Sequence, residues 1–446
     1  MICDVPIIKT FVINDDCYVY DTYTNQILSV SHDTFLEICK LQKIGIEQYK
    51  ASNRTDQQYN DVISLLSKGL LRTSFIDQIE QSYTMYLYEM VDRCINHLIL
   101  GVTNMCNFKC RYCHQAEGKV LSSKKKMEMD TAFTSVDYLF DHSKDAFEVT
   151  ITFYGGEPLL NFELIKLTVD YAINKFKTKN VVFNMTTNAS LLNEETIEFL
   201  VKNRFVLLIS LDGDYKMQNL HRRYRNNGEG TFNLVWKNIM RIKEKYPEYF
   251  NSNVSFNSVI LQDENPENTL RFFKKNGISE TAVTIRRADM NGIDYHVSSI
   301  SLFGIPNDNI IDSSIYNDYL DRYSDKNHIP QIWHHNGPCV PAVRRLFVNA
   351  DGEFYPCEKI DSDCSCKLGT LEEGINLKKA AELLNVGKLT EQECKRCWAA
   401  RFCTMCVHDC IDDGSMSKAK KLESCELQKK NAVAFLRKYV EKQRSL

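Results

Sequence analysis

The sequence lacks any run of about 18 apolar residues, which is the length that a membrane-spanning helix needs. Its N-terminus also lacks the pattern of a signal peptide. The formal net charge of −3 gives no general attraction to nucleic acid or to an anionic membrane. We therefore expect a cytoplasmic protein with no nucleic-acid and no membrane partner. Its 446 residues, 43% of them hydrophobic, suffice for two or three domains with sizeable cores.

Cysteine, in contrast, is abundant, with 17 residues in the chain. The cytoplasm keeps thiols reduced, so these cysteines do not indicate a disulfide framework. Three of them lie within residues 106–113 and ten lie within residues 339–425. The remaining four are scattered and are expected to be small buried hydrophobic side chains: Cys3, Cys17, Cys39 and Cys94. The uneven distribution indicates metal binding.

The first group has the spacing Cys-x3-Cys-x2-Cys and consists of Cys106, Cys110 and Cys113. Three thiolates can hold a cubane iron–sulfur cluster and leave its fourth iron without a protein ligand. The group follows an apolar run, His97–Val102, that reads as a strand, and an α/β barrel keeps its active site in loops at strand ends. A zinc site is the alternative, although zinc normally takes four ligands in paired groups.

The first 80 residues contain three short β-prone runs and then two helical segments. The strands are expected at Ile7–Ile13, Cys17–Asp21 and Gln26–Val30, and the helices from Ser31 to Leu41 and from Asp56 to Gly69. A small sheet followed by helices resembles a winged-helix fold, here of the kind that recognises peptides in enzymes that modify ribosomally made peptides. A DNA-binding winged helix is the alternative, but no helix of this segment is basic enough to neutralise phosphates.

Residues 95–287 alternate between strand-like and helix-like runs. The expected strands are His97–Val102, Val149–Phe153, Val181–Thr186, Phe205–Ser210, Val254–Ile260 and Ala282–Ile285. The expected helices are Thr131–Ser143, Phe162–Phe176, Asn193–Lys202, Phe232–Tyr246 and Asn265–Asn276. Six alternations predict an α/β fold with a parallel, partial (β/α)6 barrel. Residues 288–338 are less regular and are expected to bridge to the cysteine-rich region.

A second motif, Gly155-Gly156-Glu157-Pro158, follows the second of these strands. Two glycines let a ligand approach the backbone closely, and a carboxylate can accept hydrogen bonds from a ligand ammonium, although the four residues alone also fit a plain turn. With the three cysteines and Tyr112, the motif resembles the radical S-adenosylmethionine (SAM) superfamily. The resemblance implies that SAM chelates the open iron and that residues 155–157 hold its methionine amino group. Electron transfer from the cluster then yields a 5′-deoxyadenosyl radical.

Three further residues match the superfamily in barrel order. By the resemblance, Asn188 and Ser210 contact the ribose or methionine of SAM, and Arg225 meets a carboxylate. Strand-end caps and a surface ion pair are the alternatives. The family often has His-Asp where this chain has His221-Arg222, which leaves the role of position 222 open.

The ten downstream cysteines resemble a SPASM domain, expected at residues 339–446, which carries two auxiliary clusters. Together with the cluster that binds SAM, the resemblance thus implies three [4Fe-4S] clusters. Cys394, Cys397, Cys403 and Cys425 would close one auxiliary cluster. Cys339, Cys357 and one of Cys406 and Cys410 would hold the other, because position 407 is valine where the family has cysteine. Cys364 or Cys366 would complete that cluster, or its open iron would bind a substrate thiolate. A double zinc ribbon is the alternative.

The three predicted domains together resemble maturases of ribosomally synthesised peptides, and most closely the thioether-forming sactipeptide, ranthipeptide and freyrasin types. The implied partners are a cysteine-containing precursor peptide, whose leader binds the N-terminal domain, and an electron donor such as flavodoxin or ferredoxin. Carbon–carbon crosslinking and a formylglycine-generating activity like that of anaerobic sulfatase maturases are alternative reactions. An iron–sulfur sensor that binds DNA is the non-enzymatic alternative.

Overall fold

The computed structural model describes residues 4–73, 76–113, 125–261, 264–288, 331–360 and 365–444. Most of the bridging region expected at 288–338 lies outside these residues, as does Cys364. The chain forms two compact units, which are described separately. The first takes its residues from Met1–Met85, Ser314–Cys339 and Ala381–Leu446, and the second from Tyr86–Ser313 and Val340–Ala380.

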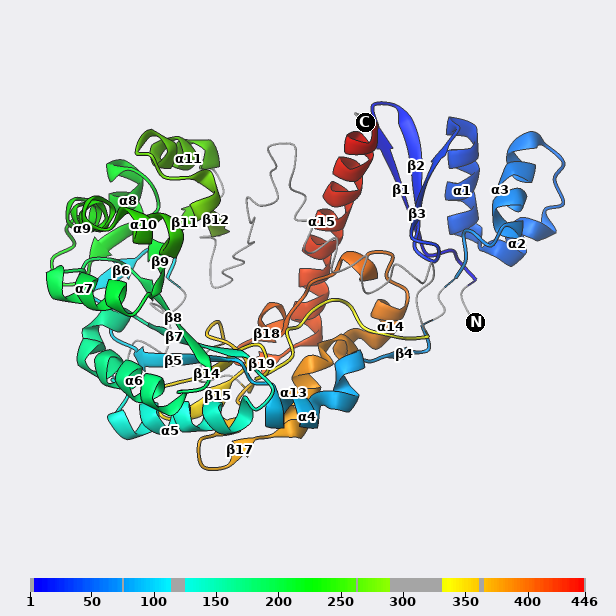
Figure 1. Cartoon of the computed structure of the whole chain (residues 1–446). Helices are drawn as coiled ribbons and strands as arrows, with labels where there is room; N and C mark the ends of the chain where they lie inside the picture. Colours follow the sequence, from blue (N-terminus) through cyan, green and yellow to red (C-terminus); the bar gives the residue numbers. More distant parts are fainter. Residues whose placement is uncertain are drawn as a thin grey trace. The chain divides into compact units, whose positions relative to one another are not determined.

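The second unit is built on a parallel sheet. Its strands are β5 (His97–Thr103), β7 (Glu148–Gly155), β8 (Asn180–Thr187), β9 (Val206–Ser210), β11 (Val254–Leu261) and β12 (Val283–Ala288). They are parallel neighbours in the order β12-β11-β9-β8-β7-β5, which confirms the six strands predicted from the sequence. The connecting helices lie along one side of this sheet (Figure 1).

Five helices of this unit agree with the predicted periodic segments to within two residues at each end. The helices of the unit are α4 (Leu87–Arg93), α5 (Met129–His142), α6 (Phe162–Lys175), α7 (Glu194–Lys202), α8 (Tyr215–His221), α9 (Phe232–Lys245), α10 (Pro247–Asn253) and α11 (Pro266–Lys275), of which α4, α8 and α10 were not predicted. Alternate strand residues pack on them, as where Phe256 of β11 meets Phe273 of α11 with ring centroids 5.0 Å apart. One face of the sheet is therefore the hydrophobic core.

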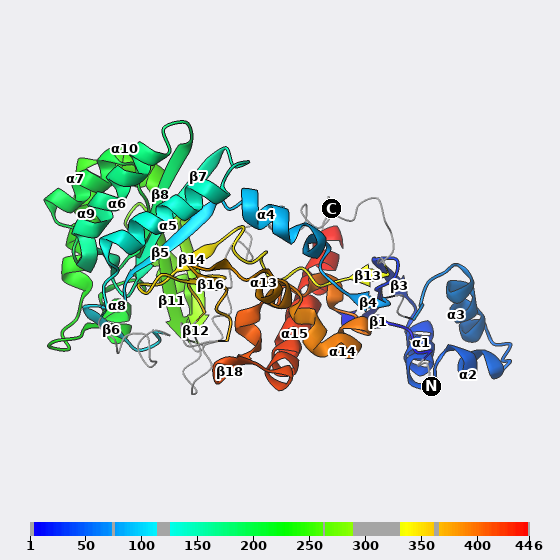
Figure 2. The same ribbon diagram turned by 90° about the horizontal axis from the view of Figure 1, so that it is seen from below.

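The sheet continues beyond β5 with residues that the sequence analysis placed in the cysteine-rich domain. These strands are β14 (Leu346–Val348), β15 (Glu353–Tyr355), β16 (Gly369–Thr370) and β17 (Gly374–Ile375). β14 lies beside β5 (Figure 2) and is parallel to it. β15 to β17 follow as an antiparallel meander. Leu346 and Val348 of β14 are fully buried, which stabilises this strand in the barrel sheet. The apolar run has only three residues, which is too short to show a periodicity in the sequence.

The first unit contains the predicted N-terminal sheet and helices. Strands β1 (Ile8–Ile13), β2 (Asp16–Asp21) and β3 (Gln26–Val30) are antiparallel, and α1 (His32–Ile44), α2 (Ile46–Ala51) and α3 (Gln57–Ser67) follow. Ser31 and Asp56 accept hydrogen bonds from Thr34 N and Tyr59 N, each at 3.1 Å, and so begin α1 and α3 as N-caps.

Both faces of this small sheet are covered. Ile8 and Val19 pack with Ile38 of α1 and Val62 of α3, whereas Phe11 and Tyr20 pack with Leu436 and Val440 on the other face. Those last two residues belong to the long helix α15 (Lys418–Arg444). The domain expected at residues 1–80 therefore shares a hydrophobic core with the C-terminal helix.

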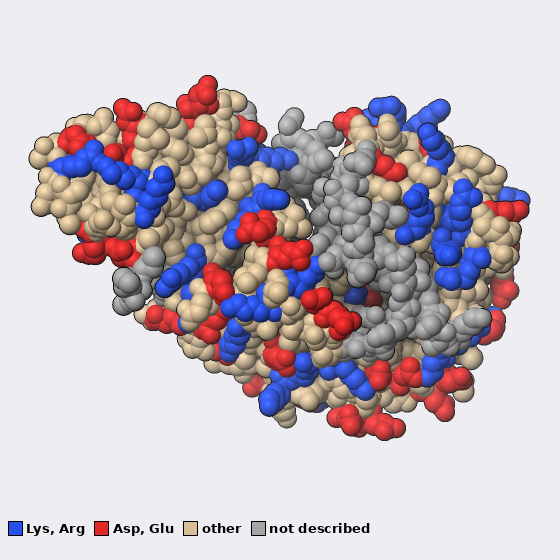
Figure 3. Space-filling view, turned by 180° about the vertical axis from the view of Figure 1, so that it is seen from behind, with Lys and Arg blue, Asp and Glu red and all other residues tan. Residues whose placement is uncertain are grey.

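Short elements complete the structure: β4 (Gln78–Ile79), β13 (Ile332–Trp333), α13 (Leu377–Leu384), α14 (Glu391–Lys395), β18 (Ile411–Asp412) and β19 (Ser415–Met416). Within the described ranges, every helix is too short or too polar to cross a bilayer. Lysine and arginine side chains are interspersed with aspartate and glutamate on the face shown in Figure 3.

Candidate active site

The three-cysteine loop lies directly after β5, at the carboxyl end of the parallel sheet. Its middle residues form a short strand, β6 (Phe108–Cys110), which pairs antiparallel with β10 (Arg222–Tyr224). Arg225 donates hydrogen bonds to the carbonyl oxygens of Cys106 (3.1 Å) and Phe108 (3.3 Å). Burial is the main cause that raises the pKa of both the Cys106 and the Cys110 thiol to about 12. The thiols therefore need a bound cation to become thiolates at neutral pH.

Gly155 and Gly156, at the end of β7, touch the backbone of the cysteine loop. The amide of Gly156 donates to the Thr103 carbonyl at 2.9 Å, and the amide of Glu157 donates to the Met105 carbonyl at 2.8 Å. A Cβ at Gly155 would lie 3.2 Å from the Thr103 carbonyl carbon and nearer still to its oxygen, and Gly155 has a φ of +134°. The two glycines are therefore required for close packing of β7 against the loop.

The Glu157 side chain is 1% exposed and is already hydrogen-bonded within the protein. Its oxygens accept from Thr187 Oγ1 (2.8 Å), Asn188 N (2.7 Å) and Leu159 N (3.2 Å). Burial raises its pKa to about 7, against the lowering effect of these donors. The carboxylate thus joins the ends of β7 and β8. Its predicted contact with SAM stays a prediction.

The other predicted SAM contacts lie at neighbouring strand ends. The Asn188 amide donates to Asn107 Oδ1 at 2.9 Å and lies 4.0 Å from Cys106 Sγ, which places it against the loop after β8. Ser210 is the last residue of β9 and is paired in register with Asn257 of β11. Tyr112 is buried, and its hydroxyl donates to Asp212. All of the predicted SAM contacts therefore belong to the same unit as the three cysteines.

A row of polar residues on the sheet face opposite the helices was missed from the sequence. Thr152 and Asn184 lie between buried apolar residues of β7 and β8, and Tyr154 and Asn257 each follow a fully buried phenylalanine of β7 and β11. Of these, Asn184 Oδ1 and Asn257 Oδ1 are buried with no hydrogen-bond partner in the described part of the chain. Buried polar atoms normally have a partner, so this face fits a polar ligand. The alternation of polar and apolar residues along these strands could have predicted this polar face from the sequence.

Four of the downstream cysteines line one cavity of the first unit, with a volume of about 320 Å³. They are Cys394, Cys397, Cys403 and Cys425, the set assigned to one auxiliary cluster. Burial raises the pKa of Cys397 to about 11 and that of Cys403 to about 12. The buried Lys421 ammonium, at 3.4 Å from Cys394 Sγ, also donates to Thr390 Oγ1.

The spacing of these side chains bears on the zinc alternative. Among the described residues, no group of three or more His, Cys, Asp or Glu side chains is close enough to hold a single metal ion. Ligands of one zinc ion all lie about 2.0–2.3 Å from that ion. The thiolates of a cubane cluster bind four different iron atoms and therefore lie farther apart from one another. The auxiliary cluster stays a prediction for this cavity.

The other predicted auxiliary ligands are divided between the two units. Cys357 lies in the second unit, and burial raises its pKa to about 11. Cys339, Cys406 and Cys410 lie in the first unit, where Cys339 is exposed and the buried Cys410 thiol donates to the Cys406 carbonyl at 3.3 Å. Cys366 is fully buried in the second unit. This ligand set stays a prediction.

Comparison with known proteins identifies the sheet and its loop. Residues 100–275 match the radical SAM superfamily. A cysteine-type anaerobic sulfatase-maturating enzyme of Clostridium novyi is 25% identical over 321 residues, which cover 66% of this chain and 80% of that protein. The radical SAM cyclopropyl synthase TigE of Paramaledivibacter caminithermalis is 25% identical over 225 residues, 47% of this chain and 45% of its own. The chain spans about half the length of TigE and of one further curated relative.

A solved structure gives the same fold. Native anSMEcpe with bound AdoMet and Cp18Cys peptide has a TM-score of 0.52 and is 19% identical, covering 79% of this chain and 99% of that one. The matched residues 100–275 include the three cysteines of the loop and the Gly-Gly-Glu motif. The chain therefore contains a radical SAM domain.

Proposed function

We propose that this protein is a radical SAM maturase that installs thioether crosslinks, from cysteine sulfur to carbon, in a ribosomally synthesised precursor peptide. The observation that carries the proposal is the second cysteine site, a cavity lined by Cys394, Cys397, Cys403 and Cys425. An additional cluster next to a radical SAM domain is what the SPASM resemblance implies for enzymes that modify peptides. Similarity to sulfatase-maturating enzymes and to TigE supports peptide or protein modification.

The residues present fit a SAM-binding cluster. Cys106, Cys110 and Cys113 would hold it, Gly155 and Gly156 keep the adjoining backbone close, and the polar sheet face offers Asn257 Oδ1 as an acceptor. When bound, the cluster and SAM would supply the radical chemistry that removes a hydrogen atom from the substrate. The protein contributes orientation and partial shielding of the loop from water, since Tyr112 is buried and Cys110 is half-buried.

The N-terminal sheet is the proposed site for the leader peptide. Helices cover one face and α15 covers the other, so the main chain remains accessible at the strand edges. β3 (Gln26–Val30) is an edge strand with β2 as its partner in the described sheet. A leader that adds a strand to β3 would gain main-chain hydrogen bonds and hold the core peptide at high local concentration.

Anaerobic reconstitution with iron, sulfide, SAM, a reductant and a cysteine-rich precursor peptide tests the proposal. Each thioether replaces one C–H and one S–H bond by a C–S bond, a two-electron oxidation for which SAM would serve as the oxidant. Mass spectrometry should therefore show the loss of two hydrogens per crosslink. The modified thiols should resist alkylation, and a peptide without its leader should react more slowly. A Cys113→Ala variant, which lacks one ligand of the loop cluster, provides the inactive control. Unchanged peptide with intact clusters and consumed SAM would refute the proposal.

A formylglycine-generating activity is the second candidate, favoured by the match over 80% of the sulfatase-maturating enzyme. The same experiment separates the two reactions. An aldehyde that reacts with hydrazine reagents identifies formylglycine, whereas a thioether gives no such product. Loss of two hydrogens with all thiols still open to alkylation would instead indicate a carbon–carbon crosslink.

A further inference from the structure

Position 222 departs from the family pattern, and the structure places it against the three-cysteine loop. In the antiparallel pair of β6 and β10, Arg222 is the residue directly opposite Cys110. Side chains of directly opposed residues lie on the same face of a strand pair and come close together. The arginine that replaces the usual aspartate is therefore a neighbour of a cluster ligand.

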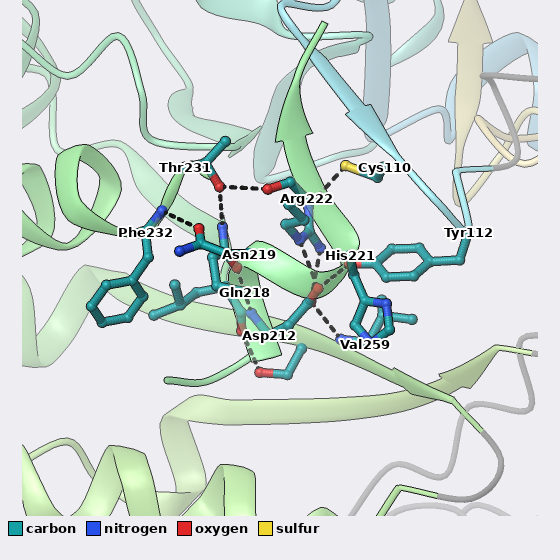
Figure 4. Close-up of polar contacts among 12 residues, drawn as sticks. Cys110, Tyr112, Asp212, Gln218, Asn219, His221, Arg222, Thr231, Phe232 and Val259 are labelled. Atoms are coloured by element: carbon teal, nitrogen blue, oxygen red, sulfur yellow. Dashed lines mark hydrogen bonds and ion pairs between the residues drawn. The ribbon is translucent and has the colours of Figure 1, made fainter. Parts of the chain in front are cut away.

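A buried carboxylate fixes the orientation of the guanidinium. Arg222 Nη2 donates to Asp212 Oδ1 at 3.1 Å, and Arg222 Nε lies 3.1 Å from Asp212 Oδ2 (Figure 4). Asp212 is itself held by Val259 N at 3.0 Å and by the Tyr112 hydroxyl. Both charged side chains are buried, with 8% of Arg222 and none of Asp212 exposed. With one hydrogen bond and one ion-pair contact to Asp212, the guanidinium has Nη1 directed at the sulfur of Cys110, 4.0 Å away.

We propose that Arg222 is a positioning residue that raises the reduction potential of the cluster held by Cys106, Cys110 and Cys113. Reduction adds one negative charge to the cluster, and a guanidinium at a ligand sulfur stabilises the reduced form more than the oxidised form. The guanidinium stays charged at all relevant pH values. Asp212 opposes this effect only in part, because the guanidinium lies between the carboxylate and the sulfur. The inference rests on the proposed function only because this cluster must be present, and it does not require that the enzyme forms thioethers.

Redox titration of reconstituted protein, followed by electron paramagnetic resonance, tests the inference. The signal that changes on addition of SAM identifies the cluster with the open iron. Replacing Arg222 by methionine should lower the equilibrium constant for its reduction about tenfold or more, which is a shift of about 59 mV for one electron. Arg222→Lys keeps the positive charge but replaces the planar guanidinium by an ammonium. The reduction potential of this variant should lie between those of wild type and Arg222→Met.

Arg223→Met is the matched control. Arg223 is the next residue of β10, is exposed, and donates to the Gly228 carbonyl at 2.9 Å. Its removal should leave the potential unchanged. Because Arg222→Met leaves Asp212 buried without its cation, a double variant, Arg222→Met with Asp212→Asn, tests the effect in a neutral surrounding and should also show a lowered potential.

Two results would overturn the inference. If both the single and the double variant bind the cluster and keep the wild-type potential, Arg222 has only a structural role. If wild-type protein takes up no SAM-responsive cluster, the iron and sulfide content shows this before any potential is measured. In that case the proposed function fails as well, so the two failures are distinguishable.

Discussion

Replacement of Gly156 by alanine is expected to push the three-cysteine loop away from β7. A Cβ at this position would lie 2.6 Å from the Met105 carbonyl carbon and 3.0 Å from the Cys106 nitrogen, and closer still to the Met105 oxygen. All of these are backbone atoms, so no side chain can rotate to relieve the contact. The loop is also tied to β7 by the hydrogen bonds of Gly156 N (2.9 Å) and Glu157 N (2.8 Å), which the displacement would stretch.

The cost can be estimated from the contact. Forcing one methyl group into a closely packed site costs about 1–3 kcal/mol, and each weakened hydrogen bond adds about 1 kcal/mol. For a domain of about 150–250 residues, 1 kcal/mol corresponds to about 2–4 °C in melting temperature. The sum is about 3–5 kcal/mol, so we expect the metal-free Gly156→Ala protein to melt about 6–20 °C below wild type by circular dichroism. We also expect its iron content after reconstitution to fall by one cluster, because the first ligand, Cys106, moves.

Gly228→Ala serves as the control. Gly228 has a φ of +71°, but a Cβ there would meet no atom within 4 Å. Alanine at this position carries only the backbone strain of a left-handed conformation, about 1–2 kcal/mol, and should keep the full iron content. Wild-type iron content in Gly156→Ala, together with a melting temperature no lower than that of Gly228→Ala, would refute the close packing of β7 against the loop.

Three further outcomes are expected. Because Glu157 has a pKa of about 7 in the folded protein against an ordinary value of 4.5, the folded state binds more protons between these pH values. Its contribution to the free energy of unfolding should fall as pH rises from 4.5 to 7, and urea titrations of Glu157→Gln should lack this slope. In metal-free protein at pH 8, Cys397, with a pKa of about 11, should react with iodoacetamide about a hundredfold more slowly than the exposed Cys339, and equal rates by mass mapping would contradict its burial. Cys425→Ser should lose about four iron atoms per chain, whereas Cys94→Ser should lose none.

The sequence was most informative about elements with strong patterns. All six parallel strands and their main helices formed where hydrophobic periodicity predicted them, because each buries an apolar face in the same core. Ser31 and Asp56 mark helix starts through local hydrogen bonds that depend on no distant residue. Residues 100–275 match the radical SAM superfamily, as the cysteine and glycine motifs predicted, whereas the role of each motif residue stays a prediction.

Elements that depend on distant partners were harder to predict. β14 has only three residues, and its place in the sheet is set by pairing with β5, about 250 residues earlier in the chain. The core that α15 shares with the N-terminal sheet likewise joins the two ends of the chain. The contact of Arg222 with Cys110 follows from the register of two three-residue strands. None of these features has a local signal, because each results from tertiary packing alone.

Both cysteine sites have a buried cation next to a sulfur, and neither cation belongs to a cysteine motif. Arg222 lies 4.0 Å from Cys110 Sγ, and Lys421 lies 3.4 Å from Cys394 Sγ. Burying several thiolates is costly in a low-dielectric interior unless opposite charge compensates them. The spacing of cysteines therefore specifies which atoms can bind iron, whereas residues that the cysteine spacing does not identify supply the compensating charge. It follows that transplanting either motif without its cation would produce a site that assembles its cluster poorly or holds it at a lower potential.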